Sequence, residues 1–537
     1  MFKNALVSVS NKEGLVDFIR PLARQGMRVV STGGTSLHLR KAGISVVEVG
    51  QQTGFEEVMD GRVKSLHPYI YMPLLARLDK KDDVKVLKDA ALSPFDLVVC
   101  NLYPFEDAKH QEKKNLVEWI DVGGPSLLRA AAKNFKYVTV LCNPEDYQCI
   151  LNEGEIPGLE KRKQLAGKVF SMLADYNFCI ADGMQAKSQE EKRSLYLKGR
   201  FYTNLRYGEN PGQKASWFQL EKTGLHQALC LQGKELSFNN ICDLDSAVST
   251  VREFRKPCCV AVKHNNPCGV AYNSQLETAI RLALKADPVS VFGAVIATNR
   301  FISEKSAQIL SSLFLEAVIA PDYSDSALAF FKSKKKNLRI MKWPELIMYN
   351  NSQKELYRTG IEKASFRTSF PLGEKKGQTE NSNRMDIHCV DGGLLVQDVQ
   401  KINKEWQKDW QYIGKKPDIS VQSELLMAWK VCAHLKSNAV ALVSGNQTVG
   451  LGMGQVNRIS SVEIAIQKWK SFHSGLSIPV MASDGFFPFP DSVEAAARVG
   501  IQWIIQPGGS LRDEEVISKA KSLSVNMVFT GQRCFSH

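Results

Sequence analysis

The sequence has 537 residues, more than one hydrophobic core usually supports, so we expect about two to four domains. With 44% hydrophobic and 23% charged residues, its composition excludes the disordered and fibrous classes. The formal net charge of +13 favours anionic partners, which include phosphorylated metabolites, a polyglutamate tail and nucleic acid.

The first 14 residues lack the basic start, apolar run and cleavage site of a signal peptide, and no stretch reaches the ~18 apolar residues of a membrane span. We therefore expect a cytoplasmic location and no membrane partner. The 12 cysteines form no CxxC pair, which excludes a zinc ribbon and a dithiol redox motif. Reduced, mostly buried thiols are the expected state.

Short apolar runs alternate with helical periodicity over residues 1 to about 150. Strands are expected at residues 5–9, 27–30, 44–49, 96–105 and 137–142, and helices near residues 13–25, 36–42 and 125–135. This alternation predicts a parallel sheet wrapped by helices, with ligands beyond the carboxyl ends of the strands. A helix-rich connection then leads to a domain boundary near residues 195–200.

Beyond that boundary, strand-like and helical segments alternate again, which predicts one or two further α/β layers. The polar stretch from Glu374 to Arg384 is interpreted as an exposed connection between two halves, divided near residues 370–390. The apolar runs begin at Cys258, Val295, Leu315, Ala439, Ile478, Ile501 and Val525.

Polar groups gather where the predicted strands of the first part end. Ser31 to Thr35 contains two glycines before a helix, a pattern that suits a phosphate but also an ordinary tight turn. Arg62 to Ser65 brings together two cations and a hydroxyl. Asp121 is expected to end a strand before the Gly123-Gly124 turn, and Lys133 lies further along the following helix, where it is either a ligand contact or a helix-end cation.

In order and wording, these stretches resemble the IMP cyclohydrolase half of the bifunctional purine biosynthesis family, a methylglyoxal-synthase-like domain. The resemblance implies a cyclohydrolase domain over residues 1–195. It implies that Lys64, Tyr103, Asp121 and Lys133 surround the reacting atoms. The residues that it implies for nucleotide binding are Ser10, Lys12, Ser31, Thr32, Gly33, Gly34, Thr35, Arg62, Ser65, Asn101, Gly123 and Gly124.

One segment departs from that pattern. Where the family has a histidine followed by glycines, this chain has Tyr71-Met72-Pro73, and we expect the loop to take a different path because proline fixes φ and lacks an amide donor. An alternative follows, in which the chain is a formyltransferase only, with a degenerate nucleotide-binding first domain.

The second part carries Arg206-Tyr207-Gly208-Glu209-Asn210 and the sequence Lys263-His264-Asn265-Asn266-Pro267, which follows an apolar run. Both resemble the family's formyltransferase half, although Gly212 stands where the family has histidine. The resemblance implies a transferase over residues 200–537 with a duplicated cytidine-deaminase-like fold. It does not extend to the zinc signature of those deaminases, so no catalytic metal is expected.

Formyl transfer needs a base for the attacking amine and a donor for the tetrahedral oxyanion, tasks that suit His264 and Lys263. The resemblance assigns Asn438 to the carboxamide, and Phe292 and Asp491 to the folate. The remaining residues implied for the nucleotide are Arg206, Tyr207, Glu316, Arg458, Phe486, Arg533 and His537.

The predicted activity is transfer of a formyl group from 10-formyltetrahydrofolate to 5-aminoimidazole-4-carboxamide ribotide (AICAR), followed by closure of the formylated product (FAICAR) to IMP. The resemblance also implies a homodimer, because the family builds its transferase site across a subunit interface. A remote alternative, supported only by the net charge of +13, is a basic nucleic-acid-binding protein.

Overall fold

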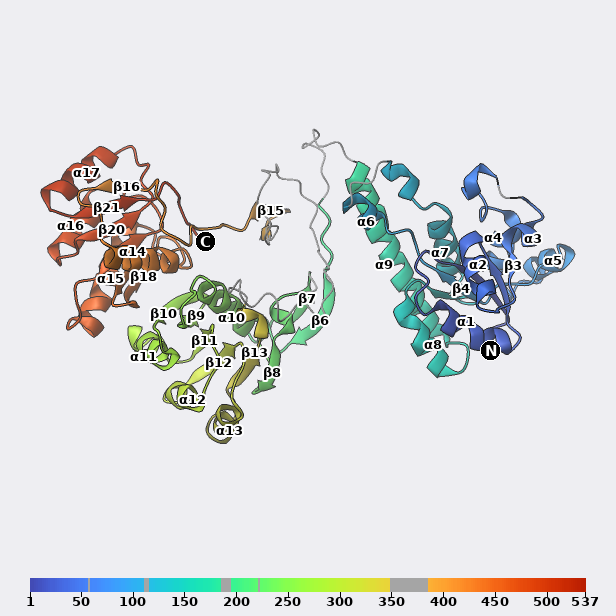
Figure 1. Cartoon of the computed structure of the whole chain (residues 1–537), viewed down its shortest axis with the longest axis horizontal. Coiled ribbons are helices and arrows are strands. Elements are labelled where there is room, and N and C mark those ends of the chain that lie inside the picture. The colour runs from blue at the N-terminus through green and yellow to red at the C-terminus, as the bar shows by residue number, and fades with distance from the viewer. Residues whose placement is uncertain (57, 111–114, 185–194, 221–222, 348–384) are drawn as a thin grey trace. The chain divides into compact units, whose positions relative to one another are not determined.

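The computed structural model describes residues 1–56, 58–110, 115–184, 195–220, 223–347 and 385–537. The described residues form two compact units, one comprising Met1–Tyr196 and the other beginning at Leu197 (Figure 1). None of the helices in these ranges combines the length and apolar character that a membrane crossing requires.

The first unit is built on a five-stranded parallel sheet with the order β3-β2-β1-β4-β5. The order reverses between β1 and β4, and ligands of such sheets bind beyond the carboxyl ends at this point. The strands are β1 (Asn4–Ser8), β2 (Arg28–Ser31), β3 (Val47–Glu48), β4 (Leu97–Cys100) and β5 (Thr139–Leu141).

Helices pack on both faces of this sheet. One core contains apolar residues of α1, α2 and α8, and the other contains those of α3, α4, α7 and α9. The helices are α1 (Leu15–Arg24), α2 (Gly33–Lys41), α3 (Val49–Thr53), α4 (Pro68–Leu75), α5 (Lys81–Asp89), α6 (Phe105–His110), α7 (Gly123–Lys133), α8 (Tyr147–Glu153) and α9 (Leu159–Met184).

The second unit contains a mixed 12-stranded sheet with the order β16-β21-β20-β19-β17-β18-β10-β9-β11-β12-β13-β8. Its first six strands in the chain are β8 (Leu229–Gln232), β9 (Cys258–Lys263), β10 (Asn266–Tyr272), β11 (Ala294–Thr298), β12 (Leu315–Ala320) and β13 (Arg339–Lys342). The other six are β16 (Gln411–Ile413), β17 (Val440–Ser444), β18 (Gln447–Gly452), β19 (Val480–Ser483), β20 (Trp503–Gln506) and β21 (Asn526–Phe529).

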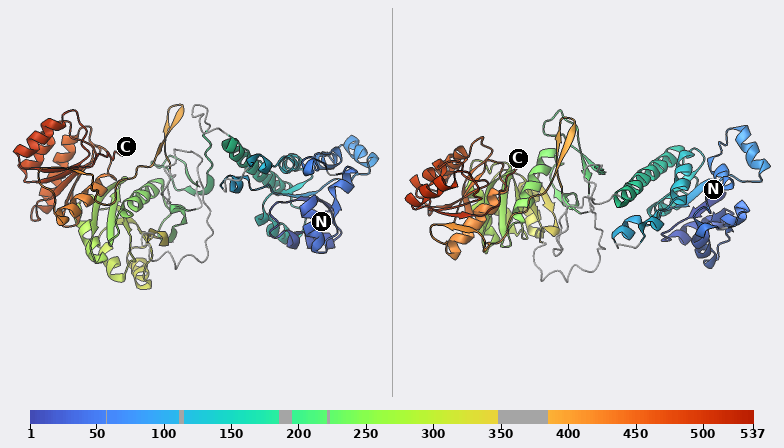
Figure 2. Two further views of the ribbon diagram at one scale, coloured as in Figure 1. Left: turned by 45° about the horizontal axis from the view of Figure 1, so that its top comes forward. Right: turned by 90° about the horizontal axis from the view of Figure 1, so that it is seen from above.

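Among the described residues of this unit, helices α10 to α17 cover the sheet, and Figure 2 shows helices on its two sides. Residues of α10 and α14 share one core, while α11 to α13 and α15 to α17 form two cores with residues of the opposite face. These helices are α10 (Phe238–Val251), α11 (Leu276–Ala286), α12 (Glu304–Leu310), α13 (Asp325–Lys334), α14 (Ile419–Cys432), α15 (Arg458–His473), α16 (Asp491–Arg498) and α17 (Asp513–Ser522).

The second unit is an internal duplication. Each half has a hairpin, two helices that flank it in the chain, and three parallel strands closed by an antiparallel edge strand. The halves meet where β10 pairs with β18. The hairpin turns also match, since His264 and Asn265 have positive φ in one, as Gly445 and Asn446 do in the other. The α/β fold with two related halves is thereby confirmed.

Two further hairpins belong to the second unit. They are formed by β6 (Arg200–Leu205) with β7 (Ala215–Gln219), and by β14 (Met385–Val390) with β15 (Gly393–Asp398). Figure 2 draws the second as a two-stranded ribbon of its own. The division expected near residues 370–390 falls partly on residues 370–384, which lie outside the described ranges, as does the Glu374–Arg384 connection.

Most predicted strands and helices are confirmed, but two local predictions are wrong. Asp121 does not end a strand, since a short 3₁₀ helix, Leu116–Trp119, precedes it. Residues 68–73 are not a loop, because they lie in α4, which starts with Pro68 at its first turn and is capped by the side chain of His67. Pro73 lies inside this helix, where it lacks the N–H that would donate to the Tyr69 carbonyl and its ring crowds that carbonyl.

Candidate active sites

Ser10 and Asn101 meet at the point where the order of the first sheet reverses. The side-chain oxygen of Asn101 accepts the backbone N–H groups of Ser10 at 2.7 Å and of Asn11 at 3.0 Å. The side-chain amide of Asn101 donates to the carbonyl of Asn11 at 2.9 Å. Lys12 extends its ammonium over the same turn and donates to the Ser10 carbonyl at 3.3 Å. This loop is therefore tied to the end of β4.

The hydroxyls that follow β2 have structural partners. Ser31 Oγ donates to the Val7 carbonyl at 2.7 Å, and Thr35 Oγ1 donates to the Val9 carbonyl at 3.0 Å. Thr32 Oγ1 lies 2.9 Å from Ser8 Oγ, and it does not cap the helix that follows. The backbone amides of Gly33 and Gly34, in the first turn of α2, are thus the groups of this loop best placed to meet an anion.

Lys64 and Ser65 lie against the first turns of two helices. A Cβ atom on Gly33, the first residue of α2, would lie 3.6 Å from Lys64 Nζ. A Cβ on Gly123, the first residue of α7, would lie 2.5 Å from Ser65 Oγ, so this hydroxyl lies close against the start of α7. Two helix N-termini, one ammonium and one hydroxyl therefore converge, an arrangement suited to an anionic ligand.

Asp121 lies beside this group. Its carboxylate accepts the backbone N–H of Gly124 at 2.8 Å, and its own N–H donates to Tyr176 Oη at 2.7 Å. Burial raises the pKa of the Asp121 carboxyl, while the amides of Gly124 and Tyr103 and the charge of Lys64 partly oppose that rise. Asp121, Tyr103 and Lys64 are therefore neighbours, and a carboxyl of raised pKa is suited to carry a proton.

Two further predicted site residues are Lys133 and Arg62. Lys133 is the last residue of α7 and is exposed, about 15 Å along the helix from Gly123. Arg62 forms an exposed ion pair with Glu118. The place of Lys133 in the last turn of α7 agrees with the alternative of a helix-end cation, and its role at the site stays a prediction.

The segment that departs from the family pattern adjoins this site. Tyr71 is half-buried on α4, which packs against α7. Burial raises the pKa of its hydroxyl, an effect partly offset by Ser126 in the first turns of α7. Tyr71 thus brings an aromatic side chain next to Ser126, in the first turns of α7.

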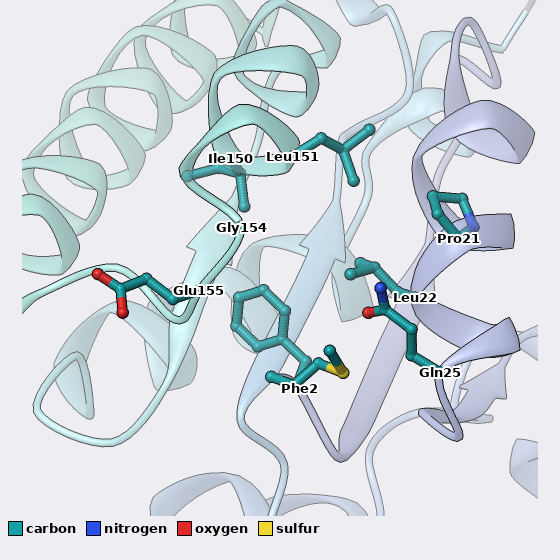
Figure 3. Close-up of a pocket in the computed structure, with 9 residues that line it drawn as sticks. Phe2, Pro21, Leu22, Gln25, Ile150, Leu151, Gly154 and Glu155 are labelled. Carbon is teal, nitrogen blue, oxygen red and sulfur yellow. The ribbon is translucent and has the colours of Figure 1, made fainter.

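A cavity of about 230 Å³ lies elsewhere in the first unit, between the N-terminal residues, α1 and α8 (Figure 3). Phe2 lines it and precedes β1, so the cavity is at the amino ends of the strands. It contains none of the predicted site residues.

In the second unit, Lys263 and His264 occupy the end of β9 and the first turn position of the β9–β10 hairpin. Lys263 Nζ donates to the Phe292 carbonyl at 2.8 Å, which leaves two of its three ammonium protons for other acceptors. His264 is exposed and has φ of 53°. The ammonium and the imidazole thus belong to adjacent residues at one strand end.

Asp243 of α10 supports this turn. Its carboxylate accepts the backbone N–H of Asn265 at 2.7 Å. Burial raises the pKa of Asp243, the Asn265 amide and the charge of His264 lower it, and Glu316 raises it further. Within the described ranges, no group of three or more His, Cys, Asp or Glu side chains is placed to hold a metal ion.

Asn438 and Arg458 lie next to that hairpin. The side-chain oxygen of Asn266 accepts the N–H of Lys436 at 3.0 Å, which joins the two segments. Arg458 Nη2 donates to Asn438 Oδ1 at 2.7 Å, and Asn438 Nδ2 donates to the Gln455 carbonyl at 2.8 Å. The Asn438 side chain is held on both sides.

The C-terminal residues pack against the same segment. The Ser536 carbonyl accepts the N–H of Ser437 at 2.8 Å, and the His537 carbonyl accepts from Lys436 Nζ at 2.5 Å. The Phe535 ring lies 5.8 Å from the Arg458 guanidinium and 5.4 Å from that of Arg533. The structure therefore brings Asn438, Arg458, Arg533 and His537 together with the Lys263 hairpin.

Other predicted residues lie around this group. Arg206 is exposed beside Tyr207, whose carbonyl accepts the N–H of Phe238 at the start of α10. Glu316 pairs with the buried Arg339 at 2.7 Å, which gives Glu316 a structural partner. Phe486 is half-buried after β19, and Asp491 is the first residue of α16.

Two residues of these sites were not predicted. Asp484 is fully buried and pairs with Arg458, and Tyr176 of α9 contacts the backbone of Asp121. Asp484 belongs to the Ser483-Asp484-Gly485 sequence, but its partners are distant in the chain. For Tyr176 the sequence carries no signal.

Each unit is an α/β structure with polar groups gathered at strand ends, so the chain is a two-unit α/β enzyme. A family model described as "AICARFT/IMPCHase bienzyme" matches residues 131–365 and 370–468, and one described as "MGS-like domain" matches residues 14–126. The chain belongs to the AICARFT/IMPCHase bienzyme family, and the resemblance inferred from its motifs is confirmed.

Curated relatives named "Bifunctional purine biosynthesis protein PurH" match along the whole chain. Those of Caldicellulosiruptor saccharolyticus and Streptococcus mutans are 41% and 43% identical, each over 100% of both chains. A chain described as "Crystal structure of ForH" is 32% identical, over 34% of this chain and 100% of that one, with a TM-score of 0.30. The chain is accordingly a bifunctional AICAR formyltransferase and IMP cyclohydrolase of purine biosynthesis.

Proposed function

We propose that the first unit closes FAICAR to IMP, and that the second formylates AICAR with 10-formyltetrahydrofolate as the donor. The observation that carries this proposal is the presence of a separate cluster of catalytic side-chain types in each unit. Lys64 and Asp121 lie at helix N-termini in one, and Lys263 and His264 at a strand end in the other.

In the transferase, the amine of AICAR attacks the formyl carbon of the folate. His264 takes the proton of the attacking amine, because it is exposed at the tip of a hairpin and its backbone is fixed through the Asn265–Asp243 bond. Lys263 is held on the Phe292 carbonyl and donates a remaining proton to the tetrahedral oxyanion. The formyl group then leaves the folate nitrogen, which is protonated as the carbon–nitrogen bond breaks.

The proposed nucleotide contacts surround these two residues. Asn438, with its orientation fixed by Arg458 and the Gln455 carbonyl, receives the carboxamide. Arginines suit the phosphate because their planar fork matches its oxygens. The residues proposed to line the nucleotide are Arg206, Tyr207, Glu316, Arg458, Phe486, Arg533 and His537, and those proposed for the folate are Phe292 and Asp491.

In the cyclohydrolase, the carboxamide nitrogen of FAICAR attacks its formyl carbon and water is then lost. We assign stabilisation of the oxyanion to Lys64, and transfer of the proton to Asp121, whose pKa burial raises and which has Tyr103 beside it. The glycines of α2 and α7 receive the phosphate and ribose together with Ser10, Lys12 and Ser65. We assign no step to Lys133.

We also propose that the protein is a homodimer through its second unit. The β14–β15 hairpin exposes Val390, Leu394, Leu395 and Val396. A two-stranded hairpin is at best marginally stable alone, and exposed apolar patches mark interaction sites. A second copy of the chain is the partner we assign to this surface. Leu395→Asp should shift the protein from dimer to monomer in sedimentation velocity, whereas an unchanged dimer would contradict this surface.

The two activities are tested separately with purified protein. AICAR with 10-formyltetrahydrofolate should yield FAICAR and then IMP, and FAICAR supplied alone should yield IMP faster than in buffer. If FAICAR accumulates and closes at the uncatalysed rate, the chain is a transferase with a degenerate first unit. Absence of folate-dependent turnover would overturn the assignment of the second unit. The cytoplasmic location and the lack of a catalytic metal stay predictions.

A further inference from the structure

We propose that Asp484 is a positioning residue for the transferase reaction, which fixes the guanidinium of Arg458 and the C-terminal residues around the bound AICAR. This inference rests on the proposed function of the second unit. Asp484 follows β19 and is fully buried. It does not itself face the predicted substrate, so it acts through the residues that it holds.

The carboxylate of Asp484 joins two segments of the site. One oxygen accepts from Arg458 Nη1, and the other accepts from Ser437 Oγ, next to Asn438. Arg458 is itself 7% exposed, so its charge needs a buried partner. With Nη1 held by Asp484 and Ser483 Oγ, Nη2 is directed to Asn438 Oδ1 at 2.7 Å.

The backbone of Asp484 joins two more segments. Its carbonyl accepts the N–H of Cys534 at 3.0 Å, which anchors the chain end that carries Arg533 and His537. Its N–H donates to the Ala439 carbonyl at 3.2 Å. Gly485 follows, and a Cβ there would lie 2.5 Å from Arg458 Nη2 and from Phe535, so the packing around the guanidinium is tight.

The internal duplication supplies a comparison within the molecule. Asn299 follows β11 as Asp484 follows β19, and its N–H donates to the Cys258 carbonyl as that of Asp484 donates to Ala439. The side chain of Asn299 bonds only backbone groups, namely Cys258 N–H at 2.9 Å and the carbonyls of Phe254 and Lys256.

A neutral amide is therefore sufficient to hold this corner of the fold in the first half. The carboxylate at the same corner of the second half binds side chains, one of which is a guanidinium. Its negative charge is explained by the placement of Arg458 and not by the needs of the fold.

The test is a double-mutant cycle on Asp484→Asn and Arg458→Gln, read as KM for AICAR and kcat of formyl transfer. Asp484→Asn should raise the KM by about tenfold to a hundredfold, the range for loss of a hydrogen bond to a charged group, with a smaller change in kcat. Adding it to Arg458→Gln should raise the KM by less than about twofold, because Asp484 acts through Arg458.

The matched control is Glu494→Gln, which also turns a carboxylate into an amide but on the exposed Lys519 pair of the same half. Its KM should equal that of the parent. Thermal unfolding of the second unit reports whether each variant is folded, because FAICAR closure reports only on the first unit. If Asp484→Asn alone does not fold, the KM of Arg458→Gln is compared with that of the double variant, in which both members of the pair are neutral. Equal KM values support the proposal that Asp484 acts through Arg458, and a higher KM in the double variant contradicts it.

A KM for AICAR in Asp484→Asn equal to that of the parent would overturn the proposal. So would a double variant whose increase in KM equals the product of the increases in the two single variants. Absence of transferase activity in the parent protein would instead refute the proposed function, so the two failures are distinct.

Discussion

Lys263 Nζ donates to the backbone carbonyl of Phe292 at 2.8 Å. The bond links the end of β9 to the loop before β11, and the Phe292 side chain in that loop is 57% exposed. Because the acceptor belongs to the backbone, the position of Lys263 does not depend on the Phe292 side chain. The two proposed roles, oxyanion donor and folate contact, can therefore be separated by substitution.

Phe292→Ala should raise the KM for 10-formyltetrahydrofolate severalfold and leave kcat within about twofold, since the ammonium keeps its acceptor. Lys263→Met should lower kcat by about 10² or more, the usual cost of removing an oxyanion donor. Initial rates over a range of folate concentrations measure both. A fall of kcat in Phe292→Ala equal to that in Lys263→Met would show that the two roles are not separate.

His264→Asn should lower formyl transfer by about 10² or more and spare the closure of FAICAR. Asparagine is preferred to alanine here because His264 has φ of 53° and asparagine accepts the left-handed region. Single-turnover formation of FAICAR measures the effect. The turn itself is kept in this variant, because Asn265 and its bond to Asp243 are unaltered. An unchanged rate of formyl transfer would refute the assignment of His264 as the base.

The fold was predictable where sequence patterns are local. The run from Cys258 to Lys263 is β9. Its successive side chains point to opposite faces of the sheet, so that Val260 enters one core and Ala261 the other. The strand expected before Asp121 is absent, because Leu116–Trp119 forms a 3₁₀ turn instead, and short apolar runs do not distinguish these two.

The sites were predictable as sets of residues but not as contacts. Lys263, His264 and Asn438 were found from their motifs, yet the bond that joins their segments, Asn266 to Lys436, spans 170 residues. The role of Asp484 was not predictable, since Arg458 and Ser437 are 26 and 47 residues away. The sequence placed Lys133 along the helix after Gly124 but left open whether it is a ligand contact or a helix-end cation.

Asp121→Asn should abolish most closure of FAICAR, by about a hundredfold, because it removes the proposed proton carrier. The substitution should also stabilise the first unit at neutral pH. Burial, the largest cause, raises the pKa of Asp121 above its ordinary value of 3.8, so the native state binds this proton more tightly than the unfolded state.

The sign of the pH dependence follows. Below pH 3.8 both states are protonated and the carboxyl has no effect, and as the pH rises through the folded-state pKa its ionisation costs stability. The gain of Asp121→Asn in unfolding free energy should thus grow with pH over this range, as measured by denaturant titration. Asp146→Asn, which removes an ion pair with Lys168 in the same unit, should leave closure unchanged. A gain that shrinks with rising pH would contradict the buried carboxyl.

The two halves of the second unit predict matched effects at Gly269 and Gly450. A Cβ on either glycine would lie 2.1 Å from a helix carbonyl, that of Ala283 in one half and of Ala465 in the other. Neither contact can be relieved by rotating a side chain, since the clashing atom belongs to the backbone. Gly269→Ala and Gly450→Ala should each lower the free energy of unfolding by about 3 kcal/mol or more, beyond the usual effect of a substitution.

Gly212→Ala is the control, because no atom lies within 4 Å of a Cβ at that position. Its unfolding free energy should stay within about 0.5 kcal/mol of the parent. Thermal and urea unfolding of the three variants measure these differences. In both variants the added Cβ pushes a hairpin strand away from the helix that follows it in the chain, so the two losses of unfolding free energy should be similar. A neutral Gly450→Ala beside a destabilised Gly269→Ala would show that the halves pack differently despite their shared topology.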